Sequence, residues 1–461
     1  MKQEQLLTLC QRHHAVLLGN AADELNIAVV GTPPGELMDS LRFASQKRID
    51  IECWTQERMD KYLQQSAPLA NVTPHEESDN AVDLLNHLLK QALIQRASDI
   101  HFEPAEHALR VRLRVDGVLH PLAPVSFPLM APLIARLKVL GGLDIAERRL
   151  PQDGQFTIDI ADKPLSFRLS TLPCRYGEKA VLRLLHKVEQ ALDLKQLGLS
   201  DREHSQLQSA LNQPQGLILV TGPTGSGKTV TLYSALQSRN HSDVNICSVE
   251  DPIEIPLDGL NQTQISPRAG LTFQNVLRAL LRQDPDIVMV GEIRDGETAE
   301  IAIKAAQTGH LVLSTLHTNS TVETLVRLEQ MGVARWMVSS ALIMVVAQRL
   351  VRRLCPHCQK RLPNAQPLPP SLWPRPLPHW TAPGCEHCYH GYQGRLALFE
   401  LLPLTPTLRQ CIAGGFSPAE LMVHARESGM TTLFENGCRA VEQGLTTQEE
   451  LLRVLGLPQD A

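Results

Sequence analysis

The sequence predicts an α/β fold built on a parallel sheet with helices on both faces, preceded by an α+β domain. From residue 197 onward, short apolar strand patterns alternate with segments of helical periodicity, which is typical of βαβ units. Residues 109–115 instead alternate strictly between apolar residues and arginines, which predicts a half-buried strand. With 461 residues, 43% of them hydrophobic and 20% charged, the chain can form two or three separate cores.

Changes of pattern divide the chain into six parts. The first 65 residues mix strand patterns at 14–18 and 26–30 with a helical pattern at 36–43, which predicts a small α/β module. A polar, proline-containing linker is expected at 66–80, because proline cannot continue a helix. The remaining expected parts are an α+β domain at 81–190, a parallel-sheet core at 197–350, a tetracysteine metal subdomain at 351–395 and a C-terminal helical subdomain at 396–461.

Charge and hydropathy exclude several classes of protein. The net charge of -5 and the aromatic content of 4% give no sign of a nucleic-acid partner. The N-terminal residues lack the order of a secretory signal, so we expect the chain to stay in the cytoplasm. The most apolar helical pattern, residues 336–346, has about half of the roughly 20 residues needed to span a bilayer and is expected to be a core helix.

The α+β domain carries a row of arginines. Arg110, Arg112 and Arg114 alternate with apolar residues, so all three point to the same face of one strand. Asp116 and Gly117 then indicate a hairpin turn. Further strands are expected at 155–160, 165–170 and 180–185. The row is either a group of cations for a ligand or a solvated sheet face.

A phosphate-binding loop directly follows the buried-strand pattern at 216–221. Its residues fit G-x-x-x-x-G-K-[ST]: Gly222, Pro223, Thr224, Gly225, Ser226, Gly227, Lys228 and Thr229. Glycines let backbone N–H groups wrap phosphate oxygens, and the positive end of the following helix adds attraction for the anion. We expect Lys228 to reach the β- and γ-phosphates of ATP, and the Thr229 hydroxyl to bind Mg²⁺.

Two later strands end in carboxylates, which hydrolysis needs in order to position metal and water. Glu250 follows the strand pattern at 246–249, and Glu292 follows that at 287–290 after Gly291. We expect Glu292 to contribute to the Mg²⁺ shell and Glu250 to orient the attacking water. The reverse assignment stays open, as does a solvated charge at either strand end.

Four of the ten cysteines form two Cys-x-x-Cys pairs: Cys355 with Cys358, and Cys385 with Cys388. Two such pairs predict one tetrahedral Zn²⁺ site that is structural, because four thiolates leave no open position. His357 and His387 are alternative ligands, and a redox dithiol is the alternative chemistry.

Several motifs together resemble the type II secretion and type IV pilus assembly ATPases. They are residues 222–229, 249–254, 281–295 and 308–318, with further likeness at 98–103, 148–154 and the cysteine pairs. The resemblance covers about residues 81 to 400. It implies a RecA-like core, a PAS-like arginine-bearing domain and a homo-hexamer with ATP between these two domains.

The resemblance also implies site residues beyond the P-loop: Asp251 and Glu254 in an acidic box, Glu292 as the Walker B glutamate, and His310 and His317 in a histidine box. Arg112 and Arg114 would supply cations to the γ-phosphate. The chain departs from the pattern in lacking Lys and Arg at 119–130 and in having a shorter N-terminal docking module.

In function, the resemblance implies a hexameric motor that hydrolyses ATP to assemble a type IV pilus or a type II secretion pseudopilus. Its partners would be an inner-membrane platform protein and associated assembly proteins, which hold it at the membrane. A pilus-retraction ATPase, a DNA-transfer ATPase and a nucleotide-binding scaffold without turnover are the alternatives. The cysteine pairs favour assembly or secretion, because retraction members usually lack them.

Overall fold

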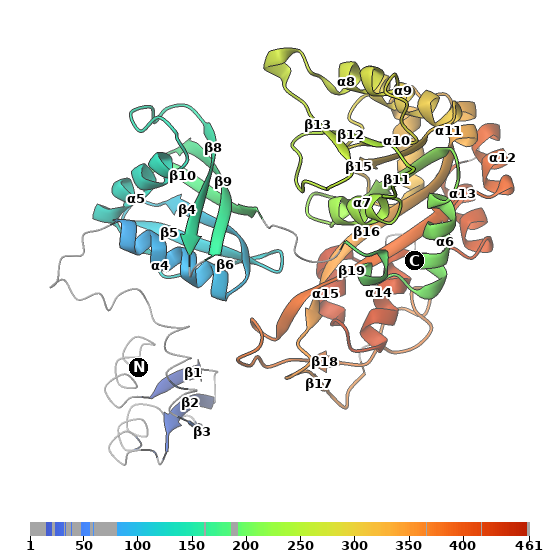
Figure 1. Ribbon diagram of the computed structural model, residues 1–461. Helices are drawn as coiled ribbons and strands as arrows, with labels where there is room; N and C mark the ends of the chain where they lie inside the picture. Colours follow the sequence, from blue (N-terminus) through green and yellow to red (C-terminus); the bar gives the residue numbers. More distant parts are fainter. Residues whose placement is uncertain are drawn as a thin grey trace.

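The computed structural model describes most of the chain. The described residues are 15–20, 24–31, 33, 38, 48–55, 59, 81–160, 163–185, 192–365, 367–415 and 417–458. Figure 1 shows two large bodies, an α+β domain drawn in blue to teal and a larger α/β part drawn in green to red. A small sheet lies near the N-terminus.

The small N-terminal sheet has three strands in the order β1-β2-β3. They are β1 (Val16–Asn20), β2 (Glu24–Val30) and β3 (Arg48–Trp54). The first two match expected strands, whereas β3 was not predicted because four of its seven residues are exposed and give no regular apolar pattern. The expected helix at 36–43, apart from position 38, and the expected linker at 66–80 lie outside the described residues.

The arginine-bearing domain (residues 81–185 as described) is an antiparallel sheet in the order β6-β5-β4-β10-β9-β8, with β7 beside β5. Its strands are β4 (Ala97–Pro104), β5 (Ala108–Val115), β6 (Val118–Pro121), β7 (Val125–Ser126), β8 (Gln152–Ile160), β9 (Lys163–Cys174) and β10 (Gly177–Leu185). Helices α4 (Ala81–Ile94) and α5 (Phe127–Leu140) pack on one face.

Strand β5 forms as its alternation predicts. Leu109, Val111 and Leu113 are buried against the two helices, so the arginines between them lie on the opposite sheet face. Asp116 and Gly117, with φ of 48° and 86°, make the tight turn into β6. The expected strand and its turn are therefore confirmed.

The larger part is built on a seven-stranded sheet in the order β13-β12-β14-β15-β11-β16-β19. Its strands are β11 (Gly216–Thr221), β12 (Ile246–Glu250), β13 (Asn261–Gln264), β14 (Ile287–Val290), β15 (Leu311–Leu316), β16 (Leu342–Leu354) and β19 (Tyr392–Pro403). Neighbouring strands pair in parallel, except that β19 runs antiparallel to β16. The α/β fold class predicted from the sequence is confirmed.

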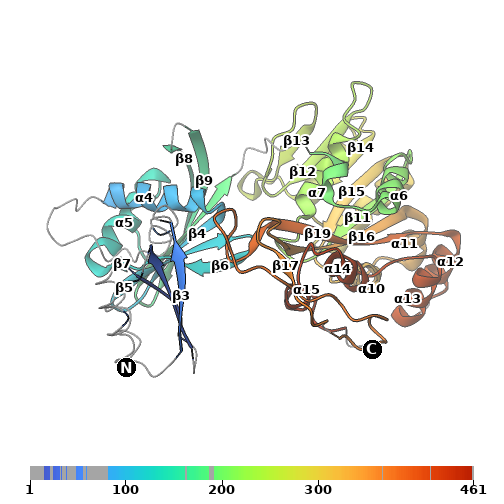
Figure 2. The ribbon, with the colours of Figure 1, turned by 90° about the horizontal axis from the view of Figure 1, so that it is seen from below.

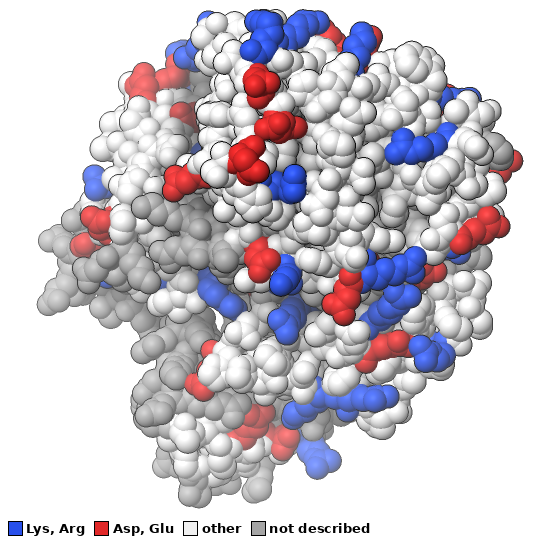
Figure 3. Space-filling model, turned by 45° about the vertical axis from the view of Figure 1, so that its right-hand side comes forward, with Lys and Arg blue, Asp and Glu red and all other residues white. Residues whose placement is uncertain are grey.

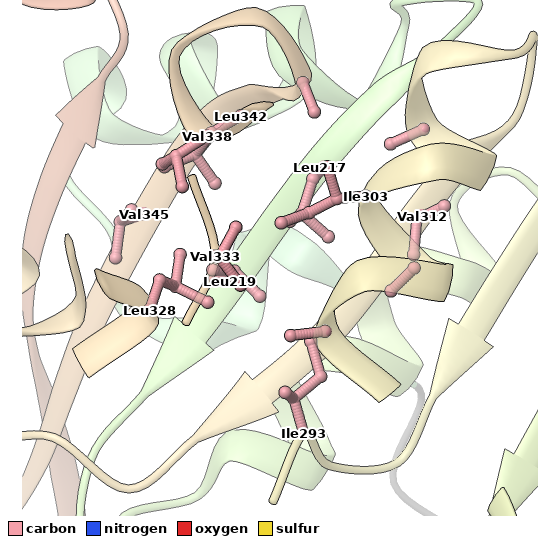
Figure 4. Close-up of a cluster of buried hydrophobic side chains, with 14 of the residues drawn as sticks. Leu217, Leu219, Ile293, Ile303, Val312, Leu328, Val333, Val338, Leu342 and Val345 are labelled. Carbon is pink, nitrogen blue, oxygen red and sulfur yellow. The ribbon is translucent and has the colours of Figure 1, made fainter. Parts of the chain in front are cut away.

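Helices cover both faces of this sheet. One face carries α8 (Phe273–Leu280), α9 (Gly296–Gln307), α10 (Thr321–Gln330) and α11 (Arg335–Ala341), and the other carries α6 (Asp201–Leu211), α7 (Lys228–Gln237) and the short η2 (Leu194–Leu197). Figure 4 shows Leu217 and Leu219 of β11 directed at the first layer, Leu217 near Ile303 and Leu219 near Val333. Ile218 and Val220 point to the second layer, so all of β11 is buried.

The expectation of a single core helix at residues 336–346 was wrong. Helix α11 ends at Ala341, and β16 begins at Leu342 and pairs with β11. Because Ile343, Val345 and Val346 are β-branched, a strand buried on both faces suits them better than a helix. Among the described helices, none is long and apolar enough to cross a membrane.

The C-terminal helices pack around β16 and β19. They are α12 (Pro406–Gly414), α13 (Pro418–Glu427), α14 (Leu433–Glu442) and α15 (Gln448–Leu455). Buried Glu400 of β19 accepts hydrogen bonds from the amides of Thr321 at 2.9 Å and Leu433 at 3.2 Å, which ties the first residues of α10 and α14 to the sheet. Short strands β17 (Lys360–Arg361) and β18 (Trp380–Thr381) lie in the cysteine-bearing segment between β16 and β19.

We expect Leu219→Ala to destabilise the core by about 2–5 kcal/mol, because the removed atoms leave a cavity in the central strand. Leu457→Ala is the matched control: this leucine is 57% exposed, and its replacement should cost less than about 0.5 kcal/mol. Urea denaturation, with hydrogen exchange of the β11 peptide as the probe, measures both changes. Equal effects of the two substitutions would contradict this assignment of the core.

Candidate nucleotide site and metal centre

The P-loop forms the turn between β11 and α7. Gly222 and Gly227 have φ of 150° and 88°, and a Cβ on either would lie within 2.8 Å of Gln348 on β16. Strand β16 therefore packs against the back of the loop and excludes side chains there. Of the remaining loop residues, Pro223, Thr224, Gly225 and Thr229 are exposed, whereas Ser226 and Lys228 are buried.

A histidine connects the P-loop lysine to the acidic strand end. Lys228 Nζ donates to the Gly222 carbonyl oxygen at 2.7 Å and lies 3.5 Å from His317 Nδ1. The other ring nitrogen, Nε2, lies 3.4 Å from Glu292 Oε2. A neutral imidazole protonated on Nε2 satisfies both contacts, because Nδ1 then accepts from the ammonium while Nε2 donates to the carboxylate.

The contacts continue past Glu292. Arg294 hydrogen-bonds Glu292, and its guanidinium lies 3.7 Å from Asp251 Oδ2. Burial alone would raise the pKa of Glu292, but the hydrogen bond and charge of Arg294 lower it overall and keep the carboxylate ionised. Lys228, His317, Glu292, Arg294 and Asp251 thus form one connected set, here called the polar row.

The polar row follows from the strand order. Strands β11, β15, β14 and β12 are parallel neighbours, so the residues that follow them meet at one edge of the sheet. Buried Thr221 and Thr318 fix this arrangement, because the Thr318 amide donates to Thr221 Oγ1 at 3.0 Å. The backbone beside His317 is thereby tied to the strand that carries the P-loop.

Glu250 lies apart from the polar row. It is buried, with Tyr233 donating to one carboxylate oxygen and Ser248 Oγ and Gln262 Nε2 donating to the other at 2.6 and 3.1 Å. These three hydrogen bonds join α7, β12 and β13 through the carboxylate. The role of Glu250 in orienting water stays a prediction, whereas Asp251, the next residue, contacts the polar row.

The two histidines of the expected box also separate. His317 follows the carboxyl end of β15, whereas His310 precedes its amino end and holds the carbonyl oxygen of Ala305 at 3.0 Å through Nδ1. The strand between them spans about 20 Å at roughly 3.3 Å per residue. Within one chain, the structure therefore does not bring His310 to the P-loop.

Arg112 and Arg114 point from the sheet face opposite α4 and α5. Arg112 Nη2 donates to Glu103 Oε1 at 2.7 Å, and Arg114 Nη1 donates to the Gly117 carbonyl oxygen at 2.9 Å. Among the residues that the structure describes, no hydrogen bond or ion pair joins either arginine to the polar row.

The same face carries further cations around two buried carboxylates. Lys179 lies 3.1 Å from Glu103, and Arg183 lies 2.8 Å from Asp99. Although burial tends to raise the pKa of Glu103, its hydrogen bonds from Arg112 and Lys179 lower it to about 2. These carboxylates hold the guanidinium groups in place, and the face keeps an excess of positive charge.

The four cysteines of the two pairs converge. All four Sγ atoms lie within 4.8 Å of one another, and Cys355–Cys385, Cys358–Cys388 and Cys385–Cys388 are each 3.7 Å apart. A tetrahedral Zn²⁺ with bonds of about 2.3 Å requires sulfur separations of about 3.8 Å, so the residues fit this ion. His357 and His387 face each other, with ring centroids 4.3 Å apart, and are not members of the four-residue cluster.

Arg294 lies within the motif at residues 281–295, but the sequence alone predicts no role for it. The sequence does place this positive charge two residues after Glu292, on the segment that follows a buried strand, which could have indicated an ion pair between the two residues. The thiol cluster, by contrast, needed only residue spacing to be predicted.

The strand order, the P-loop and the polar row at the carboxyl edge of the sheet define a RecA-like P-loop ATPase. A family model described as type II/IV secretion system protein matches residues 75–453. The chain belongs to this family.

Curated relatives agree with this assignment. The chain is 64% identical over 458 residues to the "Protein transport protein HofB homolog" of Escherichia coli (strain K12), and the match covers 99% of each chain. It is 46% identical over 391 residues to the type IV pilus assembly ATPase PilB of Pseudomonas aeruginosa, covering 82% of this chain and 68% of that one. Type II secretion system ATPase E of Vibrio cholerae is 46% identical over 385 residues, covering 82% and 76%.

Solved structures share the fold. The pilus retraction motor PilT with bound ADP has a TM-score of 0.54 at 27% identity and covers 82% of this chain and 97% of that one. The Legionella pneumophila ATPase DotB has a TM-score of 0.61 at 22% identity, covering 82% and 96%.

Nucleotide affinity should fall as the pH rises from 7 to 9. Burial lowers the pKa of Lys228 from 10.5 to about 8; the charge of Glu292 opposes this shift and that of Arg349 adds to it. The ammonium that attracts phosphate is therefore lost between pH 7 and 9 rather than above pH 10. We expect about tenfold weaker Mg-ATP binding at pH 9 than at pH 7. Titration calorimetry across this range measures the change. The Lys228→Met variant should bind Mg-ATP weakly, and its affinity should not change with pH. A wild-type affinity that does not change between pH 7 and 9 would show that Lys228 keeps an ordinary pKa.

Proposed function

We propose that the chain is a hexameric ATPase that hydrolyses ATP to power assembly of a type IV pilus or a type II secretion pseudopilus at the inner membrane. The polar row is the observation that carries the chemical part, because it joins a P-loop lysine to the carboxylate of a neighbouring strand through one histidine. The assembly part rests on the similarity to proteins named for pilus assembly and type II secretion.

In this proposal, the P-loop residues 222–229 bind the phosphates of ATP, with Lys228 as the positive charge. Thr229 and Glu292 offer the hard oxygen donors that suit Mg²⁺, which supplies positive charge against the phosphates when bound. The ionised carboxylate of Glu292 hydrogen-bonds the attacking water, and His317 orients that carboxylate. Arg294 keeps Glu292 charged, and Asp251 holds the guanidinium of Arg294 in position.

We propose further that Arg112 and Arg114 act in trans. Their sheet face carries excess positive charge and has no contact with the polar row among the described residues, so a neighbouring subunit's ATP is the phosphate they would meet. A positioned arginine stabilises the charge that develops during phosphoryl transfer. His310, remote from the P-loop in its own chain, has no catalytic task in this scheme.

The remaining assignments are proposals of the same kind. The N-terminal module up to residue 65 docks the motor to assembly proteins, and the arginine-bearing domain moves against the core during turnover. An inner-membrane platform protein receives this movement, and the motor stays on the cytoplasmic side through its partners. The four cysteines bind Zn²⁺ as a structural ion.

Two alternative functions, pilus retraction and DNA transfer, agree less well with the similarities and the charged surface of this chain. Pilus retraction finds support in the fold of PilT, but that chain is 27% identical whereas assembly and secretion relatives reach 46%. A DNA-transfer motor calls for a continuous basic surface. On the face in Figure 3, Lys and Arg are interspersed with Asp and Glu and separated by uncharged surface, which gives no such track.

The test is ATP turnover of zinc-replete protein, with and without anionic lipid, while oligomer mass is recorded in the same samples. We expect turnover to rise with hexamer formation, and Glu292→Gln to lower it by about 100-fold or more through loss of the oriented water. Lys228→Ala should in addition lose ATP binding. Glu300→Gln and Lys304→Ala, both exposed on α9, are matched controls that should keep full turnover.

Several outcomes would count against the proposal. A confirmed hexamer that binds ATP tightly without turnover in any condition would instead support a nucleotide-binding scaffold. Full turnover in Glu292→Gln would remove this residue from the reaction, and turnover by a monomer at the hexamer's rate would remove the arginines that act in trans.

A further inference from the structure

A tight turn follows the last metal ligand. Tyr389 and Tyr392 exchange two backbone hydrogen bonds of 2.9 and 3.1 Å around His390 and Gly391, whose φ values are 49° and 83°. A Cβ at Gly391 would lie 2.2 Å from the carbonyl oxygen of Ala382, so this conformation requires glycine. Residues 385–394, here called the knuckle, therefore begin with two cysteines and lead directly into this rigid turn.

The knuckle contacts the arginine-bearing domain. Tyr389 packs against the domain's apolar core, and its ring lies edge-on to His120 of β6 with centroids 4.5 Å apart. His390 stacks on His120 at 5.6 Å. The Gly394 amide donates to Asp116 Oδ2 at 3.0 Å. Figure 2 shows the end of β6 directed at the C-terminal part of the molecule, where β19 begins.

The contacted hairpin is the one that carries Arg114. Asp116 and Gly117 form its turn, and Gly117 accepts the hydrogen bond from the Arg114 guanidinium at 2.9 Å. A group that holds Asp116 thus also holds the backbone to which Arg114 is bonded.

On its other side the knuckle is fixed to the core. The Cys355 amide, at the end of β16, donates to the Gly391 carbonyl oxygen at 2.9 Å. Arg352 of β16 lies over the Tyr392 ring at 4.0 Å, and its guanidinium also binds buried Glu450 of α15 at 2.8 Å. The knuckle is therefore joined on one side to the ATPase core and on the other to the arginine-bearing domain.

We propose that the knuckle is an intrachain docking surface for the β5–β6 hairpin, and that metal binding by the four cysteines sets the position of the arginine-bearing domain on the ATPase core. Cys385 and Cys388 precede the turn, whereas Cys355 and Cys358 follow β16, so one ion that joins the pairs fixes the turn relative to the sheet. Tyr389, His390 and the Gly394 amide then hold the hairpin through contacts that need no nucleotide. This role goes beyond stabilising a small subdomain, because it gives the metal an effect on a second domain.

The test is the distance between the two domains, measured by single-molecule fluorescence transfer. Fluorescent labels are attached to a genetically encoded keto amino acid at positions 94 and 304, which are both exposed. Labelled chains are diluted in excess unlabelled protein, so that only distances within one chain are measured. Zinc-loaded protein without nucleotide should give one narrow distribution of distances between the labels. Tyr389→Ala should lose the narrow population while keeping its zinc, and chelation of zinc from the wild-type protein should lose it as well.

Matched variants separate docking from folding. Tyr389→Phe keeps the ring and should keep the narrow population, as should Lys360→Ala on exposed β17 of the same segment. Asp116→Ala should speed hydrogen exchange of the peptide containing Gly394 while the zinc content stays at one per chain. An unchanged distribution in Tyr389→Ala, or in protein freed of zinc, would overturn the proposal. A broad distribution in the zinc-loaded wild type would do the same, because the contact would then not hold the domains.

Discussion

The position of β15 between β11 and β14 is the constraint on which the nucleotide site depends. Strand β15 separates the P-loop strand from the strand that ends before Glu292, and Lys228 and this carboxylate form no direct ion pair. The residue after β15 lies between them. His317 occupies that place and has one ring nitrogen for each neighbour. The parallel order of the strands thus decides which side chain mediates between the two charges.

The remainder of the core supports this edge of the sheet from behind. Gln348 of β16 lies against the P-loop glycines, and its neighbour Arg349 donates to Asn319, just after His317. Strand β19 carries Glu400, which joins the helices after β15 to the C-terminal helices. Strands β16 and β19 also lead into the cysteine segment. The nucleotide edge meets β16 midway along its length, at Ala347 and Gln348, and the knuckle lies at the end of the same strand.

Local sequence patterns were sufficient to predict some features of the structure and insufficient to predict others. The P-loop, the arginine face of β5 and the thiol cluster depend on residue spacing along short segments, so the sequence predicted them. The burial of Glu250 among hydrogen-bond donors was not predicted, because it depends on Tyr233 and Gln262, which belong to other elements. The switch from α11 to β16 and the packing of Tyr389 on the arginine-bearing domain likewise depend on tertiary partners that no local periodicity reveals.

A double-mutant cycle tests most directly whether His317 and Glu292 act as one unit. Single-turnover ATP cleavage would be measured for His317→Ala, Glu292→Gln and the double variant, with nucleotide affinity and oligomer mass recorded for each. If His317 acts by orienting Glu292, the double variant should be no slower than the slower of the two single variants. Losses that multiply in the double variant would contradict this account, because the two residues would then contribute independently.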